Sequence, residues 1–428
     1  MSVEAYDYDW STCYDALMSY ADRCMFYKSK FLLPPIICAH GAHIANLRNK
    51  QYNYKRYEDL PPYPQGYQFY SRGGRIKDIR LHVLFTAPSG AGKDHTLGYF
   101  SEERTGTTHY SDWRHKKGGF PTKTINKVTD ASLFGTARVG KNGKIIESIG
   151  AFKEYPNGII YGSEISSVLT QFTKGGTSGL NLENLLLQAL DNGHINSDIS
   201  ILRQDYRTYA TCIWATQLVR IMVGSGFARR LWIYSFMPRH YDMVRLNEVY
   251  DQSEGIRPDL DFLLKLQRKL KTLYYNFVPK EIHWEDEYKK KRNVLVESLH
   301  LPHFEKELLD RLAIGYAVMT NYEPGDKLLE VRMDKRLHRQ MEKGLKDRIN
   351  VLDNAKEYSL LWLMGEKKWN LNSEFVPEAR AALQMTKSDI ISTIDEMVKK
   401  QTVEKKTVIG NKGGRPKIVV KAAPPEEE

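Results

Sequence analysis

A glycine-rich turn that ends in a lysine follows a short apolar run in the first quarter of the chain. Residues 81–86 (LHVLFT) are predicted to form a buried strand, and residues 87–94 (APSGAGKD) come directly after it. Glycines in such a turn let the backbone aim several N–H groups at one anion, and the following helix points its positive end there. The lysine would then reach the β- and γ-phosphates of a nucleotide. An ordinary glycine-rich strand–helix turn is the alternative.

The turn departs from the usual pattern G-x-x-x-x-G-K-[ST] at two positions. Ala87 occupies the first glycine position, and Asp94 occupies the position of the serine or threonine. The preceding strand and the Gly-Ala-Gly-Lys run still favour a phosphate-binding loop. We therefore predict that ATP is bound by the following residues: Ala87, Pro88, Ser89, Gly90, Ala91, Gly92, Lys93, Asp94 and His95.

A site of this kind needs a second strand that brings an acidic group to Mg²⁺ and to the attacking water. Residues 158–164 (GIIYGSE) form an apolar run that ends in an acid, about 70 residues downstream of the turn. Glu164 would polarise the water as a general base. The alternative is that Glu164 only caps the helix predicted to follow it at residues 165–169.

The two unusual positions predict a shared metal site. Asp94 places a carboxylate where the turn normally supplies a hydroxyl, and Ser163 places a hydroxyl where the second strand normally supplies a carboxylate. Hard oxygen ligands of either type suit Mg²⁺. We predict that Asp94 and Ser163 have exchanged roles and hold the ion together. The alternative is that both positions have decayed and that hydrolysis is slow or absent.

The order of motifs along the chain resembles that of AAA+ ATPases. A third strand is predicted at residues 211–217 (TCIWATQ), and residues 224–236 (GSGFARRLWIYSF) place two arginines before a fourth apolar run. Within the superfamily, the chain is similar to the minichromosome maintenance (MCM) helicases. Residues 129–152 contain two β-like arms around a Gly-Lys-Asn-Gly turn, and residues 182–216 resemble the MCM run of helix, hairpin and strand.

The resemblance implies roles for several further residues. Gln217, or Thr216 beside it, would orient the attacking water, and Arg230 would act as an arginine finger on the nucleotide of a neighbouring subunit. Arg311 would contact the nucleotide from a helix that resembles the MCM lid helix. Hairpins at 138–146 and 196–207 would line the channel of a hexameric ring. Five basic residues there would contact DNA phosphates: Arg138, Lys141, Lys144, Arg203 and Arg207.

Changes in composition divide the chain into four parts. We predict an N-terminal helical segment and linker at residues 1–74, an α/β nucleotide-binding core at 75–239, a helical lid at 240–348, and a winged-helix domain with a disordered tail at 349–428. The expected fold class is α/β, an AAA+ P-loop core with β-hairpin inserts. Nothing N-terminal resembles the MCM oligonucleotide-binding domain or its zinc motif, and the tip of the second hairpin lacks the MCM lysine. Both departures indicate a shortened, divergent relative of the sort found on plasmids or in viruses.

The C-terminal part has its own pattern. Residues 357–365 and 386–401 are predicted to be amphipathic helices, with Thr386 and Asp389 as a capping pair for the second. A strand, a basic glycine-rich turn and another strand follow at residues 402–422. This order predicts a winged helix-turn-helix whose wing contacts phosphate through three residues: Lys412, Arg415 and Lys417. The alternative is a winged helix that contacts protein and carries a merely solvated basic wing.

Charge and composition limit the class of protein. The net charge of +11 and the pI of about 9.1 favour a polyanionic partner. The four cysteines show no CxxC spacing, which argues against a structural zinc or a disulfide framework. No apolar run reaches the roughly 18 residues of a membrane span, and the first residues lack the pattern of a signal peptide. We expect a soluble, cytoplasmic protein without membrane contact, of prokaryotic or viral origin.

These features favour an ATP- and Mg²⁺-dependent DNA helicase or translocase that works as a homo-oligomeric ring in the replication of a mobile element or virus. Two alternatives stay open. One is an AAA+ ATPase that loads or remodels nucleoprotein complexes without unwinding DNA. The other is a DNA-binding scaffold that does not hydrolyse ATP.

Overall fold

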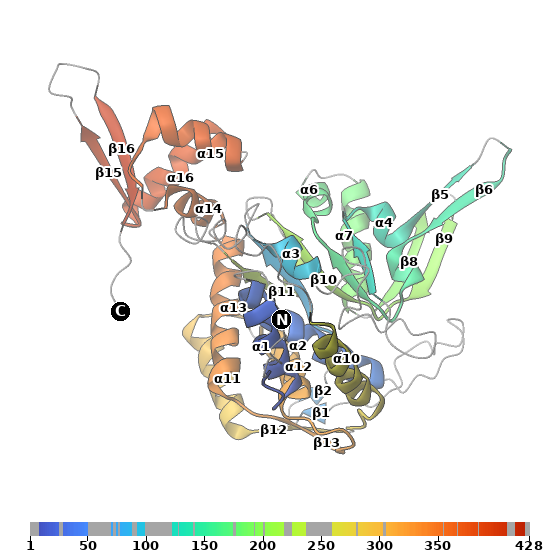
Figure 1. The fold of residues 1–428 in the computed structure, drawn as a ribbon. Coiled ribbons are helices and arrows are strands. Elements are labelled where there is room, and N and C mark those ends of the chain that lie inside the picture. The colour runs from blue at the N-terminus through green and yellow to red at the C-terminus, as the bar shows by residue number, and fades with distance from the viewer. Residues whose placement is uncertain are drawn as a thin grey trace, which may run out of the picture.

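The computed structural model gives the chain a mixed α/β fold (Figure 1). It describes residues 8–24, 29–49, 70–71, 74–75, 78–87, 92–98, 122–126, 128–139, 142–173, 177–191, 193–199, 202–217, 225–236, 259–279, 281–302, 305–353, 355–365, 367–383, 385–408 and 416–423.

A five-stranded parallel sheet lies at the centre of the fold. Its strands are β3 (His82–Thr86), β4 (Thr122–Ile125), β7 (Ile159–Gly162), β10 (Thr211–Thr216) and β11 (Leu231–Ser235). Their spatial order is β11–β3–β10–β7–β4, and every neighbouring pair is parallel. Because β10 separates β3 from β7, Trp214 is paired with Leu84 on one side and with Gly162 on the other. Helices cover both faces, which explains why β3, β7, β10 and β11 have almost continuous apolar sequences.

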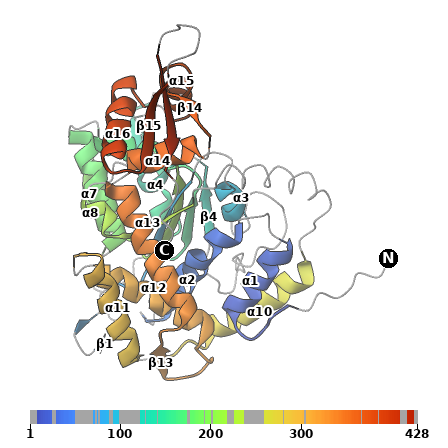
Figure 2. The same cartoon turned by 90° about the vertical axis from the view of Figure 1, so that its left-hand side faces the viewer.

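One face of the sheet packs against helices from both ends of the chain (Figure 2). Phe85, Tyr161, Ile213 and Trp232 point to this face and join one hydrophobic cluster with the helices. The helices are α1 (Cys13–Cys24), α2 (Ser29–Asn49), α3 (Lys93–Gly98), α10 (Leu260–Tyr275), α11 (Asp286–Ser298), α12 (Glu305–Thr320) and α13 (Lys335–Asp353). Two short strands, β12 (Glu281–Trp284) and β13 (Leu328–Val331), pair in parallel within the same layer.

The opposite face carries a second cluster. Leu84, Ile160, Trp214 and Ile233, which alternate with the residues above, pack against the helices on this side. These helices are α4 (Asp130–Phe134), α5 (Ala151–Glu154), α6 (Ser166–Thr173), α7 (Thr177–Asp191) and α8 (Ser225–Ala228). The sheet is therefore the middle of three layers.

Both hairpins expected from the sequence are present. The first pairs β5 (Gly135–Val139) with β6 (Ile145–Ile149) and extends away from the helices in Figure 1. The second pairs β8 (His194–Ile199) with β9 (Leu202–Arg207) and continues directly from α7. A further short antiparallel pair joins β1 (Tyr70–Ser71) to β2 (Gly74–Arg75).

Residues 355–423 form a small module with its own hydrophobic cluster. Its elements are α14 (Ala355–Met364), β14 (Trp369–Asn370), the π-helical turn η3 (Leu371–Phe375), α15 (Val376–Leu383), α16 (Lys387–Lys399), β15 (Val403–Val408) and β16 (Lys417–Ala422). The strands form an antiparallel sheet in the order β14–β16–β15. The predicted capping pair is confirmed, because the Thr386 hydroxyl oxygen accepts a hydrogen bond from the Asp389 backbone N–H at 3.1 Å.

The structure corrects two expectations about how the chain divides. The helices of residues 8–49 and 260–353 share one hydrophobic cluster with the sheet, so neither set packs apart from the core. Helix α13 runs through the expected boundary at residue 348 and ends at Asp353. Pro34 and Pro35 lie inside α2 instead of interrupting it, because the neighbouring Leu33 and Ile36 are fully buried and tertiary packing holds the helix. In the described part of the chain, no helix is long and apolar enough to cross a membrane.

Candidate nucleotide site

The carboxyl ends of β3, β10 and β7 lie side by side at one edge of the sheet, and most of the predicted catalytic residues follow them. The Ala87 backbone N–H, just after β3, donates to the Thr216 carbonyl at the end of β10 at 3.3 Å. The Phe236 N–H, just after β11, donates to the Thr86 carbonyl at 2.9 Å. These bonds fix the ends of three neighbouring strands relative to one another. We call this side of the sheet the carboxyl edge.

Lys93 is the first residue of α3, the helix that follows β3 at the carboxyl edge. Gly92 precedes it with φ +82°, a conformation that favours glycine, and its carbonyl accepts from the Thr96 N–H and hydroxyl. Lys93 is only 6% exposed, and within the described part of the chain no carboxylate forms an ion pair with its ammonium. A buried ammonium without an acidic partner is costly unless an anion compensates it.

The structure describes only some of the remaining residues of the predicted loop. Residues 88–91 (Pro88, Ser89, Gly90 and Ala91) lie outside the described residues, and so does the side chain of His95. Ala87 is buried directly after β3, and Thr86 before it has a buried hydroxyl with no hydrogen bond from a described residue. The strand, the positive-φ glycine and the helix start therefore occur as the sequence predicts.

Glu164 follows β7 at the carboxyl edge and contacts the neighbouring strand. Its Oε1 accepts from the Thr216 hydroxyl at 3.0 Å and from the Ser166 N–H at 2.8 Å. The second bond is a helix-capping contact to α6, and the first joins the carboxylate to β10, so capping is not the only contact that Glu164 makes. Because both bonds fall on Oε1, and no described residue donates to Oε2, that oxygen is available to a water. Gln217, half-buried after β10, stays a prediction beside Thr216.

The predicted metal pair is not joined by any contact in the described residues. The Ser163 hydroxyl donates to the Asn126 carbonyl at 2.9 Å, just after β4. Because β4 and β10 flank β7 on opposite sides, the hydroxyl of Ser163 and the carboxylate of Glu164 contact opposite neighbours. Asp94 lies in the first turn of α3. The exchange of ligands between Asp94 and Ser163 stays a prediction.

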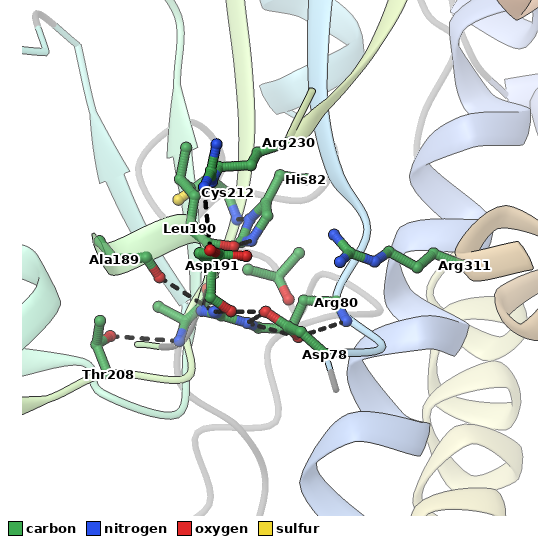
Figure 3. A network of polar contacts seen from close by, with 12 residues as sticks. Asp78, Arg80, His82, Ala189, Leu190, Asp191, Thr208, Cys212, Arg230 and Arg311 are labelled. Carbon is green, nitrogen blue, oxygen red and sulfur yellow. Dashed lines mark hydrogen bonds and ion pairs between the residues drawn. The ribbon is translucent and has the colours of Figure 1, made fainter. Parts of the chain in front are cut away.

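Arg230 lies at the opposite edge, where the strands begin. It directly precedes β11, and its guanidinium donates to the Gly226 carbonyl at 2.6 Å and to the Asp191 carboxylate at 3.0 Å (Figure 3). A five-residue strand at about 3.3 Å per residue spans about 15 Å. Arg230 is therefore remote from Lys93 of its own chain.

Arg311, which the sequence predicts as a nucleotide contact, does not lie at the carboxyl edge. The side chain extends from α12 toward Asp78 and Arg80, just before β3 (Figure 3), and it belongs to the charges that lower the pKa of buried His82. It is 7% exposed, and Glu307 on the same helix is 4.0 Å away. Arg311 therefore lies near the amino end of β3 and not beside Lys93 of its own chain, and its contact with a nucleotide stays a prediction.

The sequence did not indicate a second cation at the carboxyl edge. Lys343 of α13 donates to the Ser235 carbonyl at the end of β11 at 3.0 Å and to Asp347 at 2.8 Å. Asp347 in turn accepts from the Ser235 N–H at 2.8 Å, and burial raises the pKa of its carboxyl. The i,i+4 spacing of Lys343 and Asp347 was the available signal, but it is also the spacing of ordinary surface pairs.

The predicted DNA contacts divide into described and undescribed residues. Lys144 is exposed beside the turn of the first hairpin, Arg207 is half-buried at the end of β9, and Lys417 is exposed at the start of β16. The others lie outside the described residues, entirely or in their side chains: Arg138, Lys141, Arg203, Lys412 and Arg415. In the described wing, Lys405 forms an ion pair with Asp395 and Lys406 with Glu404, whereas Lys417 forms none with a described residue.

Compared with models of protein families and with curated protein sequences, the chain has no match. Among the described residues, no group of three or more His, Cys, Asp or Glu side chains could hold a metal ion. Mg²⁺ in phosphoryl-transfer sites needs only one or two protein oxygens, because phosphates and waters supply the other ligands. A single oxygen of the predicted pair, from Asp94 or from Ser163, would therefore be enough for that type of site.

Proposed function

We propose that this chain binds and hydrolyses ATP at the carboxyl edge of its sheet, as an ATPase of the AAA+ type. The observation that carries the proposal is Lys93, which is 6% exposed, begins the helix after β3 and has no acidic partner among the described residues. A bound triphosphate would supply the missing negative charge. A plain strand–helix turn would gain nothing from a lysine buried in this way.

The order of the strands supports the AAA+ type within the α/β class. The resemblance implies that the third core strand brings a polar group between the acid of the second strand and the nucleotide. In this chain β10 lies between β3 and β7, and the Thr216 hydroxyl donates to Glu164. The same geometry favours Glu164 as the general base, since its Oε1 is held by two hydrogen bonds while Oε2 can accept a proton from water. Bound Mg²⁺ would neutralise charge on the phosphates.

The proposal requires more than one copy of the chain. Arg230 is on the opposite edge from Lys93, so it would complete the site of a neighbouring subunit and neutralise charge that develops during hydrolysis. We propose a homo-oligomeric ring, a hexamer by the MCM resemblance.

DNA is the partner that the basic chain and the hairpins favour. We propose a helicase or translocase in which hairpins β5–β6 and β8–β9 contact DNA in the channel of the ring. Three helices and a sheet of order β14–β16–β15 make a winged helix the best description of residues 355–423. Pairing of its wing charges also favours the alternative in which this module contacts protein.

The test is phosphate release by the full chain with ATP and Mg²⁺, with and without single-stranded DNA. We expect turnover in the wild type, none in Lys93→Ala, and a strong loss in Glu164→Gln, whose fold should be retained because the amide oxygen still accepts from Ser166 and Thr216. Glu183→Ala, an acid in the middle of α7 that is not among the predicted site residues, is the control. A wild type without phosphate release, or Lys93→Ala with normal turnover, contradicts the proposal.

A strand-displacement assay then separates the two ATPase functions. A helicase unwinds a forked duplex in an ATP-dependent way, whereas a loader or remodeller releases phosphate without unwinding. A scaffold binds DNA and releases no phosphate.

A further inference from the structure

The guanidinium of Arg230 is held in one orientation by two acceptors. Nη1 donates to the Gly226 carbonyl at 2.6 Å, and Nη2 donates to the Asp191 carboxylate at 3.0 Å. A guanidinium has five N–H donors, and among the described residues these two bonds are the only ones that the guanidinium of Arg230 makes. Of the three remaining donors Nε–H is buried, which leaves one N–H on each Nη. The contact to Asp191 therefore orients the guanidinium without consuming its capacity to bind a phosphate.

Asp191 is itself fixed by the strand that leads to the candidate nucleotide site. It is the last residue of α7, and the final carbonyls of that helix accept from side chains of the segment that enters and begins β3 (Figure 3). Arg80 donates to the Ala189 carbonyl at 3.1 Å and to the Asp191 carbonyl at 3.4 Å, while His82 bonds the Leu190 carbonyl at 3.1 Å. These bonds satisfy carbonyls that a helix end leaves without a partner.

Arg80 gives this anchor its rigidity. It is 1% exposed, its Nε and Nη2 donate to the Asp78 carboxylate, and its Nη1 donates to the Ala210 carbonyl just before β10 at 2.9 Å. The end of α7 is thus tied to two central strands of the sheet.

The second hairpin starts from the same helix end. The Thr208 N–H, after β9, donates to the Gly193 carbonyl at 2.7 Å, two residues past Asp191. The Asn196 N–H of β8 donates to the Gln188 side chain of α7 at 3.0 Å. The base of hairpin β8–β9 and the carboxylate that holds Arg230 therefore belong to one rigid unit.

We propose that Asp191 is a positioning residue for Arg230: it aims the guanidinium of one copy at the triphosphate bound by the next, and it links that aim to the base of hairpin β8–β9. This inference rests on the proposed ATPase function. A misplaced guanidinium would bind ATP in the ground state as before but would stabilise the transition state poorly.

The experiment compares Asp191→Ala, Asp191→Asn and Arg230→Ala in the full chain, with Glu183→Ala on the same helix as the matched loss of one negative charge. We expect kcat to fall about tenfold in Asp191→Ala with the KM for ATP unchanged. Asp191→Asn should recover part of the loss, because its amide oxygen can accept from Arg230. Stimulation of turnover by single-stranded DNA should also weaken in Asp191→Ala.

A double variant separates positioning from a general structural effect. If Asp191 acts through Arg230, then Asp191→Ala should lower turnover no further once Arg230 is already alanine. If Asp191→Ala retains the wild-type kcat, the role of Asp191 is overturned. It is also overturned if Asp191→Ala lowers turnover as much in the Arg230→Ala background as in the wild type. Full turnover in Arg230→Ala overturns it as well, together with the arginine finger. Absence of phosphate release in the wild type contradicts the proposed ATPase function instead.

Discussion

In the absence of nucleotide, the Lys93→Met variant should be more stable than the wild type. Addition of nucleotide should stabilise the wild type but not the variant. Methionine keeps the length and most of the apolar surface of the lysine but removes its charge. Lys93 is 6% exposed without an acidic partner among the described residues, so the wild type bears the cost of a buried, uncompensated ammonium. The variant does not.

The size of the two effects follows from burial and from mass action. Leaving a buried polar group unsatisfied costs about 1–3 kcal/mol, so the free energy of unfolding of Lys93→Met should exceed that of the wild type by about that amount. A ligand at about 1,000 times its Kd stabilises the form that binds it by about 4 kcal/mol. When Mg²⁺ and a non-hydrolysable ATP analogue are added, the wild type should therefore become more stable to unfolding than Lys93→Met.

The measurement is denaturant unfolding of both proteins with and without the analogue, with Lys335→Met as the control. Lys335 is an exposed lysine at the start of α13, and its replacement should change neither stability nor the response to nucleotide. A Lys93→Met protein that is less stable than the wild type, yet is stabilised by the analogue to the same extent, would refute the reasoning that Lys93 is reserved for phosphate.

Three further outcomes are expected. Arg230→Ala should reduce turnover to a small residual rate but still bind nucleotide, and mixing it with Lys93→Ala subunits should restore some phosphate release in co-assembled rings. The free energy of unfolding should fall as the pH drops below about 6.5. Burial lowers the pKa of His40 and of His82 well below 6.5, so only the unfolded chain takes up protons there. Unfolding at several pH values should show the free energy of unfolding changing by up to about 2.7 kcal/mol per pH unit. Deleting residues 355–428 should weaken salt-sensitive DNA binding, measured by anisotropy, and leave basal hydrolysis intact, since that module has its own core.

The last deletion differs from a cut at residue 402, which the sequence pattern alone would favour. Val403 of β15 and Val420 of β16 are buried in the cluster of the C-terminal module, and β16 is the central strand of its sheet. Removing only the hairpin would expose that cluster. The hairpin is recognisable from sequence because it is local, whereas its role in the core depends on contacts between distant residues.

The same distinction runs through the fold. The strands around residues 82–86, 159–162 and 211–216 are local apolar runs, and the two hairpins carry local turn signals, so sequence reasoning found all of them. The strand order was not accessible in that way, because pairing between parallel strands joins residues far apart in the chain. Contacts such as Thr216 with Glu164 follow from that order.

The first helices illustrate the limit best. Residues 13–49 contain helical periodicity, but nothing local indicates where the helices pack. In the structure, the buried His40 ring bonds the Tyr161 hydroxyl of β7 at 2.6 Å, and His43 bonds the Thr211 hydroxyl of β10 at 2.8 Å. The N-terminal helices thus satisfy polar groups on the sheet that carries the candidate site, which makes them part of the same core.

The side chains of hairpin β5–β6 limit which of its surfaces can contact DNA in the proposed ring. Val139 pairs with Ile145 across the hairpin, and Ile149 lies four residues after Ile145 in the same strand, so the three side chains share one face. Their side chains are 59%, 51% and 62% exposed, in the order Val139, Ile145 and Ile149. The Thr136 and Ser148 hydroxyls, which hydrogen-bond each other at 3.1 Å, lie on the other face. Ile146, 48% exposed, lies on this second face as well, and the exposed Glu147 lies on the first, so the turn with Lys144 is the part of the hairpin that suits DNA best. In the proposed ring, contact with a neighbouring subunit would bury Val139, Ile145 and Ile149 more favourably than contact with DNA would.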